Sequence, residues 1–215
     1  MLSSTLEHPA SMSAMKKWAK NTQRDHIIVE HNNETGSVDE QAYIKKLTSD
    51  VRIVSVVHTS PVTGMTVDLE KITKEIRNVM PDCIIIVDGI QHSSHGAIDV
   101  QKYDIDGYVV SPYKMFSRHG YGVAWASDRL CTLNKEQLVD GPSQNWELGT
   151  RDAGSYATFS DVVDYLDWLG SNFTESENTR ERLEASSLAI RSHEQELVDL
   201  VLNGNEDIGG LRNNN

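Results

Sequence analysis

The chain alternates short apolar runs with longer stretches in which apolar residues recur at helical spacing. The short runs at residues 26–30, 51–57 and 83–87 are rich in β-branched residues and nearly continuous, as in parallel strands buried on both faces. Between them, residues 38–47 and 67–79 place apolar residues on one helical face. Residues 107–111 and 121–126 are two further predicted strands. The pattern predicts an α/β fold, with a mostly parallel sheet and helices on both faces.

The pattern changes after residue 141, because strand-length apolar runs no longer occur. Residues 156–169 and 179–202 have the spacing of two long helices, and residues 170–178 form the best candidate for a linker between them. The last part of the chain is therefore predicted to be organised differently from the part that precedes it.

Composition excludes several classes of protein. The 215 residues include 20 Lys and Arg against 32 Asp and Glu, a net charge of −12, whereas binding to a phosphate backbone needs a basic face. We therefore expect no nucleic acid partner. The longest apolar run, residues 83–87, is far shorter than the roughly 20 residues that span a bilayer, so no membrane association is expected. The first eight residues lack the features of a signal peptide.

Two cysteines, Cys83 and Cys131, provide neither a disulfide framework nor paired metal-ligand spacing. A reducing compartment fits this usage, and a cytoplasmic location is expected. His92 and His95 are three residues apart, but no cysteine, second histidine pair or carboxylate cluster completes a metal site with them. We expect them to be loop histidines and expect no metal.

Polar residues follow three of the predicted strands, at the end where open α/β sheets bind ligands. They occupy residues 58–60, 88–92 and 111–114. Asp88 comes directly after an apolar run, and a carboxylate there is costly to bury without a cationic partner. Lys114 follows another strand, where partial burial favours the neutral amine that forms a Schiff base. A lysine paired with an acid suggests pyridoxal phosphate, whose ring is an electron sink while its nitrogen stays protonated.

The segments around these residues resemble the core motifs of class V aminotransferases and cysteine desulfurases. The family pattern reads V-D-G-A-Q, I-D-V, D-F-Y-x-x-S-x-H-K and G-x-G, and the corresponding segments here are residues 87–91, 98–100, 106–114 and 120–122. The resemblance also includes Glu7 with His8, residues 58–64 and residues 147–150, and so spans about residues 1–170.

The resemblance implies an enzyme that uses pyridoxal 5′-phosphate to act on an amino acid. Lys114 is then the Schiff-base lysine that moves the α-proton, and Asp88 binds the pyridinium nitrogen. Gln91 donates to the phenolic oxygen of the cofactor, and His8 stacks on the face of its ring. Transamination, epimerisation and C–S or β-elimination are all compatible with this set.

The resemblance further implies that Ser111 and Tyr113 contact the phosphate. Thr150 corresponds to the threonine that family members offer to the phosphate of the neighbouring subunit, so a homodimer is expected. Tyr113 stands where the family has histidine, and its reference pKa of about 10 does not suit a proton relay at neutral pH. Pro61 replaces an asparagine of the family, and Ser117 with Arg118 replaces Gly-Pro.

By the same resemblance, residues 1–170 form the large cofactor-binding domain without its N-terminal phosphate-binding segment. Residues 171–215 form the linker and the first helix of a small C-terminal α+β domain. Neither cysteine matches the one that carries persulfide in desulfurases. The alternative is therefore a truncated, catalytically impaired family member that acts as a non-catalytic or partner-dependent protein. A generic nucleotide-binding domain is disfavoured because no G-x-G-x-x-G follows a first strand.

Taken singly, the candidate residues also have structural interpretations. Lysines are usually at the surface, and Asp88 has a side chain suited to capping a helix. His8 precedes Pro9, a residue that favours the first turn of a helix. The order of the matched motifs favours the cofactor interpretation for the set as a whole.

Overall fold

A computed structural model describes residues 1–142, 146–150 and 152–213 of the chain. The chain divides into two compact units, which are described separately. The first comprises residues 1–93 and 99–156, and the second comprises residues 94–98 and 157–215.

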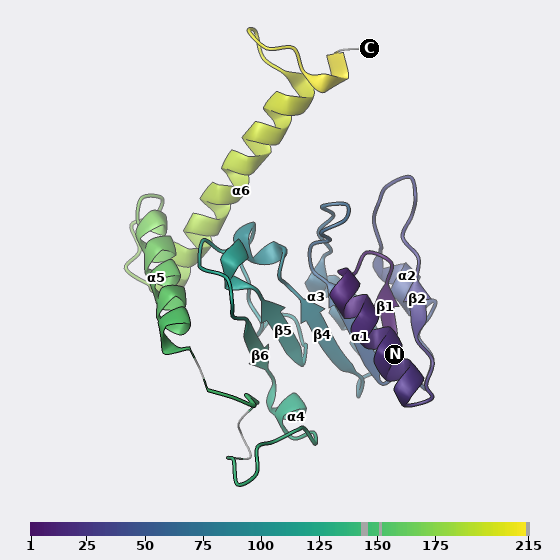
Figure 1. Ribbon diagram of the computed structural model, residues 1–215. Helices are drawn as coiled ribbons and strands as arrows, with labels where there is room; N and C mark the ends of the chain where they lie inside the picture. The colour runs from purple at the N-terminus through teal and green to yellow at the C-terminus, as the bar shows by residue number, and fades with distance from the viewer. Residues whose placement is uncertain (143–145, 151, 214–215) are drawn as a thin grey trace. The chain divides into compact units, whose positions relative to one another are not determined.

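The first unit is built on a six-stranded sheet in the order β2-β1-β3-β4-β5-β6 (Figure 1). The strands are β1 (Leu2–Ser4), β2 (Ile27–Val29), β3 (Ile53–Val57), β4 (Ile84–Asp88), β5 (Gly107–Val110) and β6 (Val123–Ala126). Strands β1 to β5 run parallel, and β6 is antiparallel to β5. The carboxyl ends of the five parallel strands therefore lie at one edge of the sheet.

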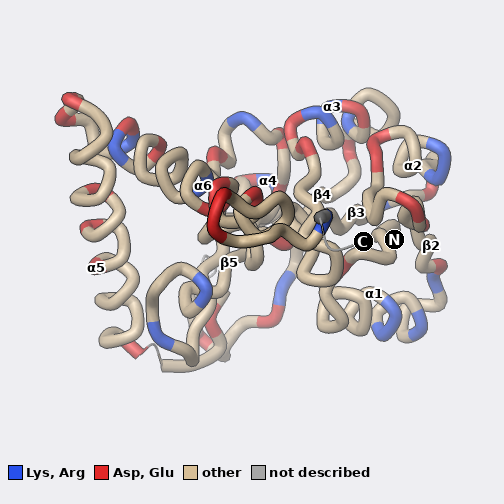
Figure 2. The backbone as a smooth tube through the Cα atoms, turned by 90° about the horizontal axis from the view of Figure 1, so that it is seen from above, with Lys and Arg blue, Asp and Glu red and all other residues tan. Residues whose placement is uncertain are grey.

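Helices cover both faces of this sheet. The helix α1 (Pro9–Asn21) lies on one face, and α2 (Glu40–Ile44) and α3 (Leu69–Val79) lie on the other (Figures 1 and 2). Asp39 and Asp68 accept hydrogen bonds from backbone N–H groups in the first turns of α2 and α3, as N-cap residues do. The apolar residues of β3 and β4, such as Val54, Val56 and Ile85, are fully buried between the layers.

Charge is unevenly distributed over these helices despite the acidic total. α1 contains lysines but no acidic residue, and the positions of its lysines are blue on the backbone tube in Figure 2. The short elements of this unit are η1 (His92–Ser94), η2 (Pro112–Lys114) and α4 (Asp128–Cys131), with η1 ending one residue into the second unit.

The structure confirms the predicted α/β fold with a mostly parallel sheet. All five predicted strands are present, although most are shorter than predicted; the last begins at Val123 rather than Tyr121. The prediction missed β1 and α1, both of which precede the first predicted strand. The helix predicted over residues 38–47 is shorter and spans Glu40–Ile44.

The second unit contains α5 (Ala153–Gly170) from residue 157 onward, α6 (Thr179–Asn203) and η3 (Leu211–Asn213). Asn178 caps α6 by accepting a hydrogen bond from the Glu181 N–H, and Arg182 pairs with Asp167 at 3.3 Å. Both long helices agree with the sequence pattern. Within the part of the chain that the structure describes, no helix is long and apolar enough to cross a membrane. The predicted domain boundary after residue 170 stays a prediction.

Candidate active site

Residues beyond the carboxyl ends of four strands line one cavity of about 170 Å³ within the first unit. The contributing segments follow β1, β3, β4 and β5, because parallel strands bring their carboxyl ends to the same edge. The cavity is lined by His8, Ala10, Ser11, Thr59, Pro61, Asp88, Ile90, Gln91, Ser111, Tyr113 and Lys114.

Asp88 ends β4 at the cavity and is buried, with 7% of its surface exposed. Ser11 Oγ donates to its Oδ2 at 3.2 Å, and the Ile90 N–H donates to its Oδ1 at 3.1 Å. Among the described residues it has no ion pair. A buried carboxylate is stabilised by an opposite charge, so Asp88 is suited to a ligand that brings a protonated nitrogen.

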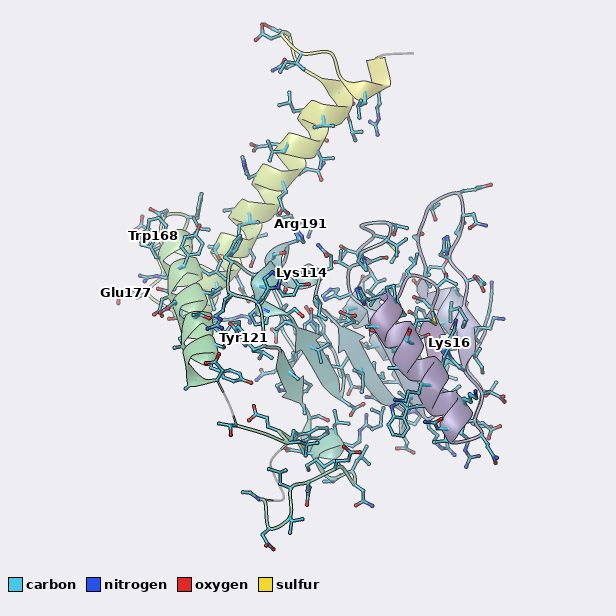
Figure 3. The ribbon with its side chains drawn as sticks, in the orientation of Figure 1. Lys16, Lys114, Tyr121, Trp168, Glu177 and Arg191 are labelled. Atoms are coloured by element: carbon cyan, nitrogen blue, oxygen red, sulfur yellow. The ribbon has the colours of Figure 1, made fainter. Side chains whose placement is uncertain are left out.

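Lys114 ends the short turn η2, which is separated from β5 by Ser111 alone (Figure 3). Its Nζ donates to Gln91 Oε1 at 2.9 Å and lies 6.0 Å from the centre of the Tyr113 ring. Gln91 follows β4, so this hydrogen bond joins the segments after two neighbouring strands. The amine is thereby held at the cavity with Asp88 also in its wall.

His8 forms the wall of the cavity at the start of α1. Its Nδ1 accepts a hydrogen bond from the Ala10 N–H at 3.1 Å, which makes it the N-cap of the helix. Pro9 follows at the first helical position, where its fixed φ angle suits a helix start. The structural interpretation of His8 is thus confirmed, and the same residue also lines the cavity.

Two stacked rings come from residues on either side of Lys114 in the chain. The rings of Tyr113 and His119 lie 4.1 Å apart with an angle of 17° between their planes. Tyr113 is 40% exposed and reaches the cavity, whereas Arg118 pairs at 3.6 Å with Asp152 and does not line it. Position 113 thus lacks the histidine of the family, but the imidazole of His119 stacks on the tyrosine ring that stands there.

A buried aromatic cluster that sequence reasoning missed supports the same edge of the sheet. His58 donates or accepts a hydrogen bond through Nδ1 with the Tyr108 hydroxyl at 2.8 Å, and its ring stacks on His92 at 3.5 Å. Burial, with a smaller contribution from His92, lowers the pKa of His58 to about 3. His92 Nδ1 also lies 3.0 Å from the hydroxyl of Thr59, a cavity residue. No sequence spacing connects these residues, so only the fold reveals the cluster.

The structure brings together six of the seven predicted site residues, namely His8, Asp88, Gln91, Ser111, Tyr113 and Lys114. The seventh, Thr150, is exposed and does not line the cavity. His95 pairs with Glu194 at 2.7 Å, and His92 belongs to the aromatic cluster. Over residues 1–142, 146–150 and 152–213, no group of three His, Cys, Asp or Glu residues is arranged to hold a metal ion.

Comparison with known proteins identifies the family. The family profile for aminotransferase class V matches residues 1–195. The chain belongs to this family. A probable cysteine desulfurase of Mycoplasma genitalium is 27% identical over 135 residues, which cover 63% of this chain and 33% of the relative. A probable cysteine desulfurase of Halobacterium salinarum is 25% identical over 211 residues, covering 90% of this chain and 46% of the relative.

Solved structures of the family share the fold. The crystal structure of the cysteine desulfurase CsdA from Escherichia coli superposes with a TM-score of 0.65 at 23% identity, covering 84% of this chain and 46% of that one. The chain thus spans less than half the length of these relatives. At this identity the likeness shows the fold, a mostly parallel sheet covered by helices.

The cavity fits the cofactor that the family resemblance implies. Pyridoxal phosphate needs an amine for its aldehyde and an acid for its ring nitrogen. Lys114 is an amine in the wall of the cavity, and Asp88 is a buried acid whose hydrogen-bond donors are a hydroxyl and a backbone N–H rather than a cation. The cavity therefore offers an amine for the aldehyde and an acid for the ring nitrogen, which are the two groups that the cofactor needs.

Proposed function

We propose that the cavity binds pyridoxal 5′-phosphate and that the chain carries out, or contributes to, chemistry on an amino acid through Lys114. The observation that supports this most is the placement of a buried acid and a lysine in the wall of one cavity, at the carboxyl ends of β4 and β5. The cofactor, when bound, withdraws electrons from the carbon atom that loses a proton or another substituent.

Each side chain has a role that follows from its position. Asp88 holds a proton on the ring nitrogen by offering it a negative charge, and Ser11 fixes the orientation of that carboxylate. Lys114 would hold the aldehyde carbon through its Nζ, and its freed amine would move the α-proton of the substrate. Gln91 orients the Lys114 amine from the neighbouring segment. His8 offers its ring to one face of the cofactor.

The class of reaction proposed is chemistry at the α-carbon, with transamination, epimerisation and elimination as the possible outcomes. The names of the relatives point toward cysteine as a substrate. However, neither cysteine of this chain lines the cavity, since Cys83 precedes β4 and Cys131 ends α4. A persulfide-carrying cysteine is therefore not part of the proposal.

The deciding experiment mixes the purified chain with pyridoxal 5′-phosphate and records the visible absorption of the protein-bound cofactor. We expect a band in the wild type that is lost in Lys114→Ala. Free aldehydes also react with surface amines, so Lys16→Ala is the matched control. Lys16 is an exposed lysine of α1 and should leave the band unchanged (Figure 3).

The substitution Asp88→Asn provides a second test of cofactor binding. It keeps the shape of the side chain but removes the charge, so it should weaken cofactor binding while unfolding remains cooperative. No band in the wild type, or equal bands in the wild type and Lys114→Ala, would refute the proposal and favour a non-catalytic or partner-dependent protein. If a band is found, adding single amino acids and following its changes identifies the substrate.

We also propose a homodimer in a reducing, cytoplasmic compartment.

A further inference from the structure

Glu7 is a buried carboxylate that the proposed chemistry does not use. It lies between β1 and α1 and is 4% exposed. Its Oε1 accepts hydrogen bonds from the Val57 N–H at 3.1 Å and from Ser4 Oγ at 3.4 Å, and its Oε2 accepts one from Ser55 Oγ at 3.1 Å. One side chain thus connects the segment after β1 to the last residues of β3.

The segment that Glu7 holds continues directly into the cavity wall. His8 comes next in the chain, and Ala10 and Ser11 follow in the first turn of α1. Ser60 Oγ supplies a second connection to β3 by donating to the Leu6 carbonyl at 3.0 Å. Because Ser11 donates to Asp88, the position of this segment also affects the Asp88 carboxylate in the cavity wall.

The charges around Glu7 are unusual for a buried acid. Asp88 faces it from β4, and Tyr43, which is fully buried, faces it from α2. The described residues offer it no cation within salt-bridge distance. Burial raises the pKa of Glu7 to about 7, the hydrogen bond from Ser55 opposes the rise, and the negative charge of Asp88 adds to it. Glu7 therefore changes its charge near neutral pH, close to Asp88.

We propose that Glu7 is a positioning residue that braces the cavity wall formed by His8, Ala10 and Ser11 against β3, and that its ionisation is coupled to the charge of Asp88. The inference rests on the proposed function only for the identity of the ligand. A cation bound at Asp88 offsets the negative charge there, and so favours the ionised form of Glu7. Ligand binding is then accompanied by loss of a proton from Glu7.

Two substitutions separate the effect of the hydrogen bonds that Glu7 makes to β3 from the effect of its negative charge. Glu7→Gln keeps an oxygen for the Val57 N–H and an amide that donates to Ser55, but it cannot ionise. Glu7→Ala removes both. In the unliganded chain we expect amide hydrogen exchange to be slow at Val57 and in the first turn of α1 for the wild type and Glu7→Gln. It should be at least tenfold faster for Glu7→Ala, measured by NMR under conditions in which all three remain folded.

The coupling is measured in the same unliganded proteins by carbon NMR of the glutamate carboxyl groups, with Glu7 assigned from the signal missing in Glu7→Gln. We expect Glu7 to titrate near pH 7 and its midpoint to fall in Asp88→Asn. Titration near the ordinary glutamate value of about 4.3, or a midpoint that Asp88→Asn does not move, overturns the coupling. Unchanged exchange in Glu7→Ala overturns the brace.

Cofactor affinity provides a third measurement, in which failure of the proposed function can be told apart from failure of the proposed role of Glu7. The affinity of the wild type for pyridoxal 5′-phosphate should change with pH around 7, and this change should be smaller in Glu7→Gln, which cannot ionise at position 7. Glu7→Ala should bind at least tenfold more weakly at every pH. If the wild type binds no pyridoxal phosphate, the proposed function fails, and the measurements on the unliganded chain still decide the role of Glu7.

Discussion

At the scale of single residues, the position of Asp88 in the cavity wall depends on the close approach of the Tyr108 ring to Gly89. Gly89 follows Asp88, and a Cβ placed on it would lie 2.1 Å from Cε1 and 2.3 Å from the hydroxyl oxygen of Tyr108. Tyr108 is 3% exposed, so its ring has little room to move. The tyrosine also hydrogen-bonds to His58. Glycine at position 89 is therefore needed for the ring to pack beneath the segment that carries Asp88.

Gly89→Ala tests this contact. The added methyl group forces the Tyr108 ring aside and breaks its hydrogen bond to His58, so we expect a loss of about 2–3 kcal/mol in the free energy of unfolding. Gly149→Ala is the control, because a Cβ there meets no atom within 4 Å. Urea denaturation measures both. Equal stabilities for the two variants would contradict the steric argument.

His58 predicts how stability depends on acid. Its folded pKa of about 3 lies below the ordinary value of 6.5, so its contribution to stability is complete above pH 6.5 and is lost as pH falls from 6.5 toward 3. The shift corresponds to a loss of about 3 kcal/mol between pH 7 and pH 4. Glu7 has the opposite effect, since its raised pKa disfavours the folded state progressively as pH rises from about 4.5 toward 7.

Comparison with a variant isolates the histidine from Glu7 and from the other acids. His58→Gln cannot become charged, so the free energy of unfolding should fall less between pH 7 and pH 4 than in the wild type. His119→Gln removes an exposed histidine and should follow the wild type. Parallel acid dependences in the wild type and His58→Gln would show that His58 accepts a proton in the folded state.

At the scale of elements, one carboxylate connects four of them. Asp106 precedes β5 and is 1% exposed. It accepts hydrogen bonds from Arg77 of α3 at 2.8 Å, from Arg129 of α4 at 2.7 Å and from the Ile85 N–H of β4 at 2.8 Å. These donors satisfy a charge that burial alone would disfavour.

Asp106→Ala should cost about 3 kcal/mol in the free energy of unfolding, because it leaves the Arg77 guanidinium without its buried carboxylate partner and the Ile85 N–H without its acceptor. Arg77 is the more sensitive partner, since its side chain is only 10% exposed. Asp104→Asn removes the charge of a neighbouring side chain that is 74% exposed and lies 3.6 Å from Arg77, and asparagine is tolerated at the positive φ angle of 46° found there, so it should change stability by less than about 1 kcal/mol. Thermal and urea unfolding of the two variants check the difference.

The elements also show which parts of the fold can be predicted from sequence. The buried strands β3 and β4 were predictable because nearly every residue is apolar and β-branched. β1 was missed because it has three residues and two of them are serines, and α1 because its serine, methionine and lysine residues give no clear apolar face. Lys114 and Asp88 were identified by motif, whereas the contacts of Glu7 with β3 depend on strand pairing that no local pattern contains.

At the scale of the whole molecule, Thr150 connects the site to the proposed assembly. It is exposed and lies outside the cavity of its own chain. The family resemblance gives this threonine to the phosphate of a neighbouring subunit, so its position outside the cavity is compatible with that role. In a two-fold dimer each chain then completes the pocket of the other.

Two measurements test this arrangement. Sedimentation equilibrium should give a mass of twice 24.0 kDa for the wild type and for Thr150→Ala. Thr150→Ala should bind pyridoxal 5′-phosphate about tenfold more weakly, because a hydrogen bond to a charged phosphate is lost. A mass of 24.0 kDa for the wild type, or undiminished affinity in Thr150→Ala, would contradict the shared site.

Mixed dimers distinguish a contribution in trans from an effect within one chain. When Lys114→Ala and Thr150→Ala chains are unfolded together and refolded, a hybrid dimer contains one pocket with Lys114 from one chain and Thr150 from the other. About half of the pockets that retain Lys114 should then bind with wild-type affinity, as random pairing of two chains in a two-fold dimer requires. If Thr150 acted on the cavity of its own chain, every Lys114 pocket in the mixture would keep the weaker affinity. The fraction of tight binding therefore reports directly which subunit supplies the threonine.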